Sequence, residues 1–522
     1  MYQSSVSAAR SRVNASRLLV LATMLVALAL LAWDAQAFLA AAVRAIRYPF
    51  ELDYGEGIVW QQAEQMRAGN AYGAITGFPA IVFHYPPLYH AITLVASGLS
   101  GVDMLMAGRA VSVAATLLTS LFAGMIVFRT ARFDADRNAA LLCAFVAGFA
   151  VLGLSPVGGW GPLMRVDMVA MALGLGGIWC TMLAFERPRA IIFAAACFVA
   201  AVYTKQTAIA APAAAFTTLM LIRPRTALVG ISTSFLLGVL VLAPLTWATD
   251  GGFERHIFLY NINRFDFSRL GALVGVMSQH APYLAIVIIA LFKLERRHSL
   301  FAMGEHRSNA NGSGEACVML LLVYLGFAAL MMLTIAKIGS NVNYIIETLC
   351  VVAILVGIAC RDAAQGILTR STLREGDAPI AWMAVPILIA VQGLAAPAPL
   401  HAELQGAQLR EMNELVAMVH DARRPVISDN MVAVKRAGRE VVWEPAIFTE
   451  LASKGLWDER PFVQRIRDGQ FAFFVTVGDR GQRVFDSRYT PATMDAMDAA
   501  YPVRRHLAKF TLHLPRSQAA AK

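Results

Sequence analysis

The stretch MLMAGRAVSVAATLLTSLFAGMIVF (residues 104–128) is followed directly by RTARFDADRN (residues 129–138). The first segment is long enough to cross a hydrocarbon core, which takes about 20 apolar residues. The second segment carries three arginines, and Lys and Arg gather in loops on the cytoplasmic side of a membrane. The two segments together predict a membrane span that ends in a cytoplasmic turn.

The composition of the whole chain agrees with this prediction. Of 522 residues, 57% are hydrophobic and 15% are charged, and the mean hydropathy is +0.56. Soluble proteins average about a quarter charged residues, so we expect an α-helical polytopic membrane protein. The biases of disordered, collagen-like, coiled-coil and disulfide-stapled chains are missing. We interpret the net charge of +10 as a topology signal, and the six cysteines, which lie in or beside apolar runs, as small hydrophobic residues.

About eleven apolar runs fit a membrane span, for which roughly 17 to 25 residues are tolerated. They are residues 18–33, 104–128, 139–157, 168–185, 190–203, 207–222, 227–247, 270–292, 316–336, 344–360 and 379–394. The fifth and sixth runs are short, and two half-buried helices that meet at residues 204–206 are an alternative for them.

The first run has two interpretations. Arg10, Arg12 and Arg17 precede it, and Ala35-Gln36-Ala37 after it also resembles a signal-peptidase site. Both interpretations place the chain that follows Trp33 outside the cytoplasm.

The topology depends on residues 88–99, an apolar stretch of only about 12 residues that is too short to cross. We expect an interfacial or re-entrant helix there. With that choice, every cytoplasmic connection carries an excess of Lys and Arg or a tight Arg pair, as the positive-inside rule requires. These connections are residues 129–138, 186–189, 223–226, 293–315 and 361–377. Counting residues 88–99 as a span would place the arginine-rich turn outside.

This topology divides the chain into two parts. We expect a membrane domain over residues 1–394, whose first outer loop covers residues 43–103, and an extracytoplasmic tail over residues 395–522. In the tail, short apolar strands alternate with helical patterns, which predicts a small α/β domain of roughly 120 residues. The expected strands are residues 425–428, 441–443 and 471–477, and the expected helices include residues 403–420 and 461–467.

An acidic segment, ELDYGEG (residues 51–57), follows the first span on the outer side. Asp53 and Glu56 are three residues apart, so a helical turn would place both carboxylates on one face. A carboxylate in a partly dry cleft, next to a second carboxylate, is suited to act as a general base. The alternative is a solvated acidic turn that caps a helix starting near Ile58.

Two further outer segments carry polar groups close to the membrane. His84 and Tyr85 precede two prolines that end extended chain and open a short helix. Aromatic residues at such places also serve as interfacial anchors. Arg165 and Asp167 open the fourth span, where the alternative to a functional role is a snorkelling pair.

The later outer segments add cations, amides and a carboxylate. Lys205, next to Gln206, lies between two short apolar runs, and a lysine near hydrocarbon costs several kcal/mol unless it is paired or faces water. The carboxylate of Glu347 lies within a predicted span, and an intramembrane carboxylate indicates a functional site unless a structural partner, such as Lys337, explains it. Because all of these residues fall on one side of the membrane, we expect a cleft with carboxylates for proton abstraction and donors for a phosphate. The remaining polar residues of this set are Asn261, Asn263, Asn341, Asn343, Tyr344 and the intramembrane Glu347.

Together these features resemble a bacterial polytopic glycosyltransferase of the GT-C superfamily, which contains protein O-mannosyltransferases and the lipid A aminoarabinose transferase. The resemblance rests on the acidic motif after the first span, Pro-Pro-Leu-Tyr at residues 86–89, Arg-x-Asp at residues 165–167 and a tail outside the membrane. Some bacterial members also share Lys-Gln-Thr, here residues 205–207, and Gly-Ser-Asn-x-Asn-Tyr, here residues 339–344.

The resemblance implies a function as well as a fold. Such enzymes, in the bacterial inner membrane, transfer a sugar with inversion from a polyprenyl-phosphate donor to a glycan, lipid or protein acceptor on the periplasmic side. By this resemblance Asp53 is the catalytic base and Asp167 the second acidic residue, with Glu56 as a further candidate. No nucleotide sugar, Gly-rich phosphate loop or nucleic acid is expected. No cofactor follows, and a divalent metal ion is left open.

Two other functions stay open at this point. A transporter or scramblase of a lipid-linked or small polar solute would also use intramembrane Lys and Glu. Such proteins tend to have inverted repeats and sites near the midplane, whereas this sequence shows no repeat and gathers its polar groups at one face. An enzyme that joins glycans in bulk, such as an O-antigen ligase or polymerase, shares the donor chemistry.

Overall fold

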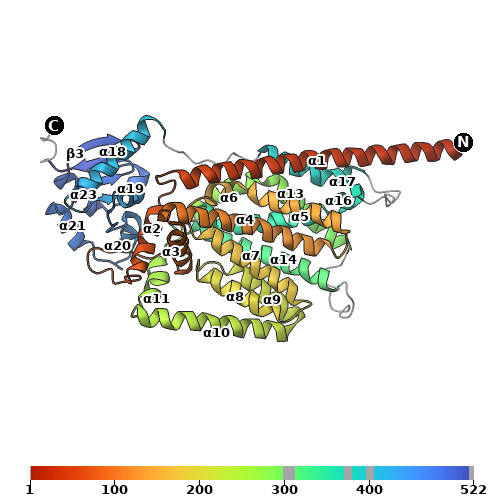
Figure 1. The fold of residues 1–522 in the computed structure, drawn as a ribbon, viewed down its shortest axis with the longest axis horizontal. Helices are drawn as coiled ribbons and strands as arrows, with labels where there is room; N and C mark the ends of the chain where they lie inside the picture. The colour runs from red at the N-terminus through yellow and green to blue at the C-terminus, as the bar shows by residue number, and fades with distance from the viewer. Residues whose placement is uncertain (1, 298–311, 369–378, 396–404, 517–522) are drawn as a thin grey trace.

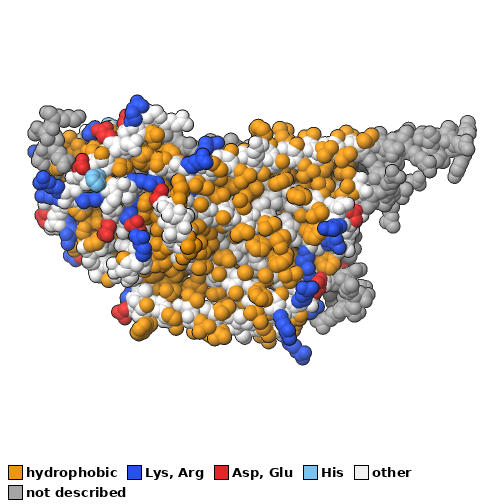
Figure 2. All heavy atoms as spheres, in the orientation of Figure 1, with side chains coloured by type: hydrophobic (Ala, Val, Ile, Leu, Met, Phe, Trp, Pro, Cys, Tyr) orange, Lys and Arg blue, Asp and Glu red, His pale blue; other side chains and the backbone are white. Residues whose placement is uncertain are grey.

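A computed structural model describes residues 2–297, 312–368, 379–395 and 405–516. The helices form an elongated bundle, with a small sheet domain at one end and the N-terminus at the other (Figure 1). On the face shown in Figure 2, apolar side chains cover the middle of the bundle, and charged side chains gather toward its two ends. This distribution is expected of a protein whose middle faces lipid.

Within the described residues, six helical segments are long and apolar enough to cross a membrane. They lie in α1 (Tyr2–Arg47), α4 (Met104–Ala131), α7 (Asp167–Ala184), α10 (Pro224–Ala248), α14 (Gly312–Met332) with η3 (Leu333–Ala336), and η4 (Val342–Ile345) with α15 (Ile346–Ala359) and α16 (Arg361–Leu368). A seventh would combine α12 (Leu270–Gln279) with α13 (Ala281–Arg297), which meet at an angle of 78°. The shorter apolar helices are α3 (Leu88–Ser100), α5 (Arg137–Leu152), α8 (Ala190–Val202), α9 (Ala210–Ile222) and α17 (Pro379–Ala395).

The predicted helical membrane bundle with a small mixed sheet near the C-terminus is confirmed, whereas the number of eleven spans stays a prediction. The six long segments and the bent pair account for seven of the expected runs, and shorter helices account for the other four. Residues 270–292, expected as one span, are divided at His280. Residues 35–37 lie inside the continuous helix α1, which packs against α17.

Side-chain caps and a proline fix several helix ends. The carboxylate of Asp103 accepts hydrogen bonds of 3.0 and 3.1 Å from backbone N–H groups in the first turn of α4. Asp136 caps α5 in the same way, at 2.9 and 3.0 Å. Pro224 stands in the first turn of α10, where the missing N–H group is not needed. Asp136 thus gives the arginine-rich turn between α4 and α5 a defined end, at the start of α5.

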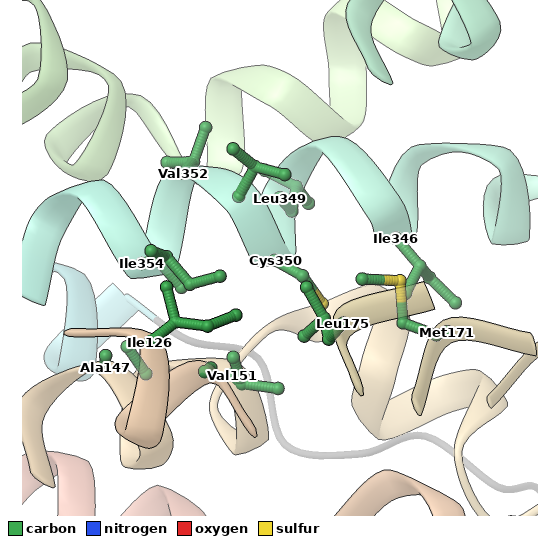
Figure 3. Packing of buried hydrophobic residues seen from close by; sticks show 14 of the residues in the cluster. Ile126, Ala147, Val151, Met171, Leu175, Ile346, Leu349, Cys350, Val352 and Ile354 are labelled. Carbon is green, nitrogen blue, oxygen red and sulfur yellow. The ribbon is translucent and has the colours of Figure 1, made fainter. Parts of the chain in front are cut away.

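Helix α15 lies inside the bundle, with every side chain from Thr348 to Gly357 buried. Figure 3 shows side chains of α4, α5 and α7 packed against it. A Cβ atom on Gly357 would lie 2.7 Å from the Cβ atom of Ala147 and 2.9 Å from the carbonyl oxygen of Cys143. Small residues permit such close helix contacts, which stabilise membrane bundles. This packing holds α15 and the polar residues at its N-terminal end in place.

The C-terminal region folds around a four-stranded mixed sheet in the order β1-β2-β4-β3. Strands β1 (Ile427–Ser428) and β2 (Phe474–Thr476) are parallel, whereas β4 (Phe510–Leu514) is antiparallel to β2 and to β3 (Val503–Leu507). The helices of this region are α18 (Ala407–Asp421), α19 (Met431–Arg436), α20 (Pro445–Ser453), α21 (Arg460–Arg467), α22 (Arg483–Asp486) and α23 (Pro491–Ala500).

The sequence predicted this region only in part. The strands expected at residues 425–428 and 471–477 are present in shorter form, as β1 and β2. The strand expected at residues 441–443 is wrong, because this segment is irregular and makes one backbone contact, from the N–H of Ala80 to the carbonyl of Val442 at 3.0 Å. Strands β3 and β4 were not predicted.

The first outer loop and the tail share their hydrophobic cores. Tyr48, Phe50 and Phe83 from the loop lie in one cluster with Met412 and Leu512 from the tail. A second cluster joins the loop to the tail in the same way. The tail is thus docked on the loop that carries the acidic segment. The short helices near this junction are α2 (Glu56–Arg67), α6 (Ser155–Trp160), α11 (Gly252–Ile257), η1 (Leu259–Asn261) and η2 (Phe267–Arg269).

Cysteine labelling of intact cells tests the topology. Helix α3 has 13 residues and is about 20 Å long, against a hydrocarbon core of about 30 Å. We therefore expect an impermeant maleimide to label Thr76→Cys and Ser100→Cys, at the two sides of α3. Asp134→Cys, in the arginine-rich turn, should react only after permeabilisation. Labelling of Asp134→Cys but not of Ser100→Cys in intact cells would make α3 a span.

Candidate active site

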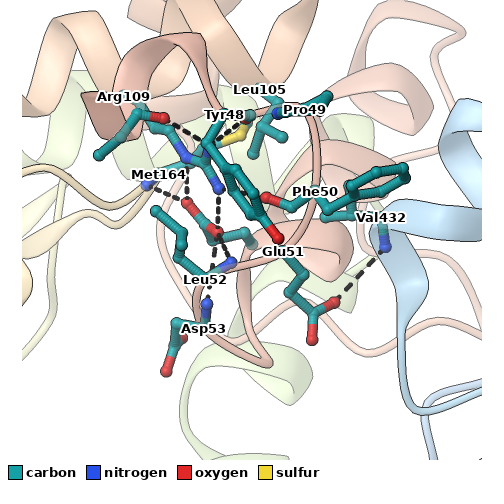
Figure 4. Close-up of polar contacts among 12 residues, drawn as sticks. Tyr48, Pro49, Phe50, Glu51, Leu52, Asp53, Leu105, Arg109, Met164 and Val432 are labelled. Carbon is teal, nitrogen blue, oxygen red and sulfur yellow. Dashed lines mark hydrogen bonds and ion pairs between the residues drawn. The ribbon is translucent and has the colours of Figure 1, made fainter. Parts of the chain in front are cut away.

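The acidic segment is held in place by Arg109, a buried cation of α4 (Figure 4). The Nε and Nη2 atoms of Arg109 donate to the two carboxylate oxygens of Glu56 at 2.8 and 2.6 Å. Its other N–H groups donate to the carbonyl oxygens of Ala45, Tyr48 and Phe50 at 2.6 to 2.7 Å. All five guanidinium N–H groups are thus used, and they fix the chain that leads from α1 into the acidic segment.

Glu56 is fully enclosed by these contacts. Neither its side chain nor that of Arg109 is exposed, at 0% each. Glu56 also accepts hydrogen bonds from the backbone N–H groups of Leu52 and Met164, at 2.8 and 2.9 Å. Burial alone would raise the pKa of Glu56, but the charge and hydrogen bonds of Arg109 outweigh it and lower the pKa. Glu56 therefore stays ionised and committed to the loop.

Asp53 has a different environment. Its side chain is 20% exposed and lies before the first turn of α2, so the expected shared helical face with Glu56 is wrong. Figure 4 shows its carboxylate pointing away from Arg109. The carboxylate accepts a hydrogen bond from the N–H of Gly55 at 3.1 Å and lies 3.5 Å from the Nη1 atom of Arg165. Asp53 is thus accessible, whereas Glu56 is not.

Arg165 reaches the acidic segment because residue 55 is glycine. A Cβ atom on Gly55 would lie 1.4 Å from the Nη1 atom of Arg165. The guanidinium also lies over the ring of Trp160, 5.3 Å from its centroid. The Nε atom of Arg165 is buried and has no hydrogen-bond partner among the described residues. Arg165 therefore keeps donor capacity that the protein itself does not use.

Asp167, at the start of α7, is the centre of a second polar cluster. Its Oδ1 atom accepts hydrogen bonds from Lys205 Nζ at 2.7 Å and Asn343 Nδ2 at 2.8 Å, and its Oδ2 atom from Trp160 Nε1 at 2.7 Å. The ammonium of Lys205 also lies 4.6 Å from the ring centroid of Tyr344. Burial alone would lower the pKa of Lys205, but the charge of Asp167 outweighs it and raises the pKa. The structure thus brings together four residues of the predicted site, Asp167, Lys205, Asn343 and Tyr344.

Tyr85 lies between the two clusters. Its hydroxyl is within the electrostatic reach of Arg165, Asp167, Tyr344 and Lys205, and burial raises its pKa. In the part of the chain that the structure describes, no hydrogen bond is made by this hydroxyl. Tyr85 is thus a neutral donor between the two cations.

The other predicted residues hold the surrounding loops. His84 is turned toward the tail, with its Nε2 atom 2.7 Å from Glu444 Oε2. Gln206 and Asn261 both donate to the backbone carbonyl of His84, at 2.9 and 3.4 Å. Asn263 donates to the carbonyl of Ile338 at 2.8 Å. Gln206 and Asn261 thus fix the segment that precedes α3, and Asn263 fixes the segment between η3 and η4.

Asn341 and Glu347 also have partners within the protein. Asn341 caps η4 through the N–H of Val342, at 2.8 Å. Glu347 accepts a hydrogen bond from the hydroxyl of Tyr324 at 2.9 Å, so its structural partner is Tyr324 and not Lys337, which was the alternative to a functional role. Glu347 lines a cavity of about 50 Å³ together with Asp167, Lys205 and Asn343.

An apolar groove begins next to this cluster. It has a volume of about 440 Å³ and runs between α8, α9, α10 and α11. Pro86 and Gln206, which line it, are the chain neighbours of Tyr85 and Lys205. The rest of the lining is almost entirely aliphatic and aromatic, including Phe216, Phe235 and Phe253. A polar site and an apolar groove are therefore adjacent.

No protein-family model and no curated protein sequence matches this chain. Solved structures do match it. ArnT from Cupriavidus metallidurans bound to undecaprenyl phosphate aligns with 91% of this chain and 96% of its own length, with a TM-score of 0.55 and 14% identity. The chain has the fold of ArnT. The apo state of ArnT aligns over 93% and 98% of the two chains, with a TM-score of 0.55 and 12% identity.

The ArnT fold confirms the predicted likeness to the lipid A aminoarabinose transferase, and at this level of identity it concerns the fold alone. The apo oligosaccharyltransferase of Archaeoglobus fulgidus also aligns, over 85% of this chain and 69% of its own, with a TM-score of 0.50 and 11% identity. The ArnT fold and the apolar helices identify the chain as a multi-pass membrane protein.

The side chains of this site are not arranged as the ligands of a metal ion. Among the described residues, no group of three or more His, Cys, Asp or Glu side chains is close enough to hold a metal ion. Asp53 and Asp167 each lie against a cation of the protein instead. The arrangement therefore offers two paired carboxylates and two cations, without a preformed cation site.

Several residues on which this site depends were not predicted from the sequence. Arg109 is the most important, and a lone arginine within an apolar run was the signal, because it needs a partner in the membrane. Trp160 links Asp167 to Arg165, and Glu444 of the tail binds His84. No local pattern marks Trp160 or Glu444, because their partners are set by the tertiary structure.

Proposed function

We propose that this chain is a membrane glycosyltransferase that moves a sugar, with inversion, from a polyprenyl-phosphate carrier to an acceptor outside the cytoplasm. The observation that carries the proposal is the accessible carboxylate of Asp53 beside Arg165, next to Lys205 and an apolar groove. The ArnT structure with bound undecaprenyl phosphate supports a polyprenyl-phosphate donor for this fold. A glycan, a lipid and a protein are the acceptor classes that this chemistry admits.

The location follows the same proposal. Residues 1–394 would form the membrane domain, with residues 43–103 as its first outer loop, and residues 395–522 an outer domain. The site would face the periplasm of a bacterial inner membrane. The docking of the tail on the first outer loop supports one part of this division, namely that the loop and the tail lie on the same side of the membrane.

Asp53 is the proposed base. In an inverting displacement, the acceptor hydroxyl loses a proton while the carrier phosphate leaves with the electrons of the anomeric C–O bond. Asp53 is exposed enough to meet an acceptor, whereas Glu56 is enclosed and bonded on both oxygens. We therefore assign Glu56 as a positioning residue, in place of the catalytic role predicted from the sequence.

Arg165 and Lys205 are the proposed phosphate ligands, with the hydroxyl of Tyr85 between them. Arg165 has an unused buried donor and only a 3.5 Å contact with Asp53. A phosphate that binds Arg165 would draw its charge away from Asp53. Asp167 and Asn343 would keep Lys205 oriented.

The groove beside Gln206 is the proposed path of the polyprenyl chain. Its apolar lining suits an isoprenoid, and it begins one residue from both Tyr85 and Lys205. A phosphate at the two cations would therefore leave the attached chain at the mouth of the groove. This arrangement places the reaction at the membrane boundary, where the carrier stays in lipid.

Transfer by the purified chain tests the proposal. The full-length protein is incubated with short-chain polyprenyl-phosphate sugars and an envelope extract, and transfer is followed by mass spectrometry of the products. We expect sugar-dependent release of polyprenyl phosphate and a glycosylated acceptor. Solute or lipid movement in proteoliposomes without any transfer would favour the transporter or scramblase instead.

The two cations should contribute to donor use. A charge-assisted hydrogen bond contributes about 1.5 to 3 kcal/mol, so Lys205→Met and Arg165→Gln should each lower turnover or donor affinity by roughly ten- to a hundredfold. Lys337→Met, a cation at the same end of the bundle that does not line the cavity, should stay near wild type. Thermal stability measured in parallel separates a lost ligand from a weakened fold. Unchanged kinetics for both site variants would remove these cations from the site.

A further inference from the structure

A large groove lies at the end of α4 that is opposite to the acidic segment. It has a volume of about 1060 Å³ and runs between α4, α5 and α7. Small residues form its floor where α4 and α5 approach, and a Cβ atom on Gly124 would lie 3.1 Å from the carbonyl oxygen of Ala144. Its apolar walls include Leu117, Leu121, Phe128, Phe145, Phe149 and Trp179.

Basic side chains form the rim of this groove. Arg129 pairs with Glu186 at 2.8 Å, while Arg132 and Arg137 are exposed. Within residues 2–297, 312–368, 379–395 and 405–516, neither Arg132 nor Arg137 forms an ion pair. Of the nearby carboxylates, Asp134 binds Arg361 and Asp136 caps α5. The described part of the rim therefore carries two exposed arginines that form no ion pair.

The dimensions of the groove match one leaflet of a membrane. From Leu117 to Arg132, two of the residues that line it, α4 rises about 22 Å at 1.5 Å per residue. One leaflet contributes about 15 Å of hydrocarbon, half of a core of about 30 Å, and the headgroup region lies beyond it. The apolar walls thus lie at acyl-chain depth, and the arginines lie at the level of the headgroups. Basic side chains gather at this end of the bundle, away from the sheet domain (Figure 2).

We propose that this groove binds a diacyl phospholipid with an anionic headgroup. An acyl chain would lie against Phe145, Phe149 and Trp179, and the headgroup would meet Arg132 and Arg137. These two exposed arginines favour an anionic over a zwitterionic headgroup, since each basic residue near a membrane surface adds to the attraction. The open apolar walls favour a lipid over a free phosphate. This site is separate from the proposed active site and does not depend on the proposed function.

Native mass spectrometry of the purified full-length protein tests the site. The protein in detergent is titrated with phosphatidylglycerol and with phosphatidylcholine of the same acyl chains. At about 1 kcal/mol for each arginine, we expect wild-type protein to prefer phosphatidylglycerol by roughly ten- to thirtyfold. Arg132→Gln/Arg137→Gln should lose this preference. The control Arg223→Gln/Arg225→Gln, an exposed pair at the start of α10 that does not line this groove, should retain it.

Fluorescence locates the bound lipid. Phosphatidylglycerol with brominated acyl chains should quench the emission of Trp179, so the quenched fraction should fall in Trp179→Phe. Equal retention of the two lipids by wild-type protein would overturn the proposal. Equal loss of preference in the Arg132/Arg137 and Arg223/Arg225 variants would do so too, because it would reflect general surface charge. Quenching that is the same in Trp179→Phe would place the lipid elsewhere.

Discussion

Asp53→Asn should lower sugar transfer by about 10² to 10⁴-fold, the usual contribution of a general base, while the protein stays folded and inserted. The side chain is 20% exposed, and its carboxylate accepts one hydrogen bond, from the N–H of Gly55, and makes a long contact with Arg165. An amide of nearly the same shape keeps an oxygen for that hydrogen bond and should disturb the fold little. The measurement is the transfer rate of purified protein at saturating donor and acceptor. Thermal stability should stay close to that of wild type.

Glu51→Gln is the matched control for this experiment. Burial, followed by the charges of Glu56 and Asp53, holds the pKa of Glu51 well above its ordinary value, which favours the neutral form of its carboxyl. An amide is a close match for that form, and activity should stay within about twofold of wild type. If Asp53→Asn keeps its activity while Glu51→Gln loses it, the base would be Glu51.

Breaking the pair of Glu56 and Arg109 should give the largest loss of stability. Removal of one partner from a buried ion pair costs about 3 to 5 kcal/mol, because the other charge stays buried without compensation. Glu56→Gln or Arg109→Met should therefore lower the thermal unfolding temperature strongly, whereas Asp53→Asn should not. Glu56→Leu/Arg109→Met should recover only part of the loss, because the three backbone carbonyls that Arg109 binds would still lack a donor.

The pH dependence of this stabilisation follows from the sign of the pKa shift. Arg109 lowers the pKa of Glu56 below its ordinary value of 4.5. Such a carboxylate contributes stability that is fully present above the ordinary pKa and is lost as the pH falls through the lowered value. The difference in stability between wild type and Glu56→Gln should thus be constant from about pH 8 to pH 5 and shrink only in stronger acid. A difference that shrinks near neutral pH would contradict this account of the pair.

The two halves of the site differ in how far the sequence predicted them. The spacing of spans placed Asp53, Arg165, Asp167, Lys205 and Asn343 on one side, and the structure brings them together. The sequence did not distinguish Asp53 from Glu56, which lie three residues apart but have 20% and 0% of their side chains exposed. That difference depends on Arg109, which is 53 positions from Glu56 along the chain.

The sequence by itself determined the membrane bundle and the end at which polar residues gather. It did so because membrane insertion depends on the length and hydropathy of each run, and these are local properties. The tertiary structure alone decided the partners: Lys205 with Asp167, Glu347 with Tyr324, and His84 with Glu444 of the tail. It also decided that the tail shares its core with the first outer loop, and that β1 pairs with β2. Such contacts join distant segments, and no local pattern of the chain specifies which segments will meet.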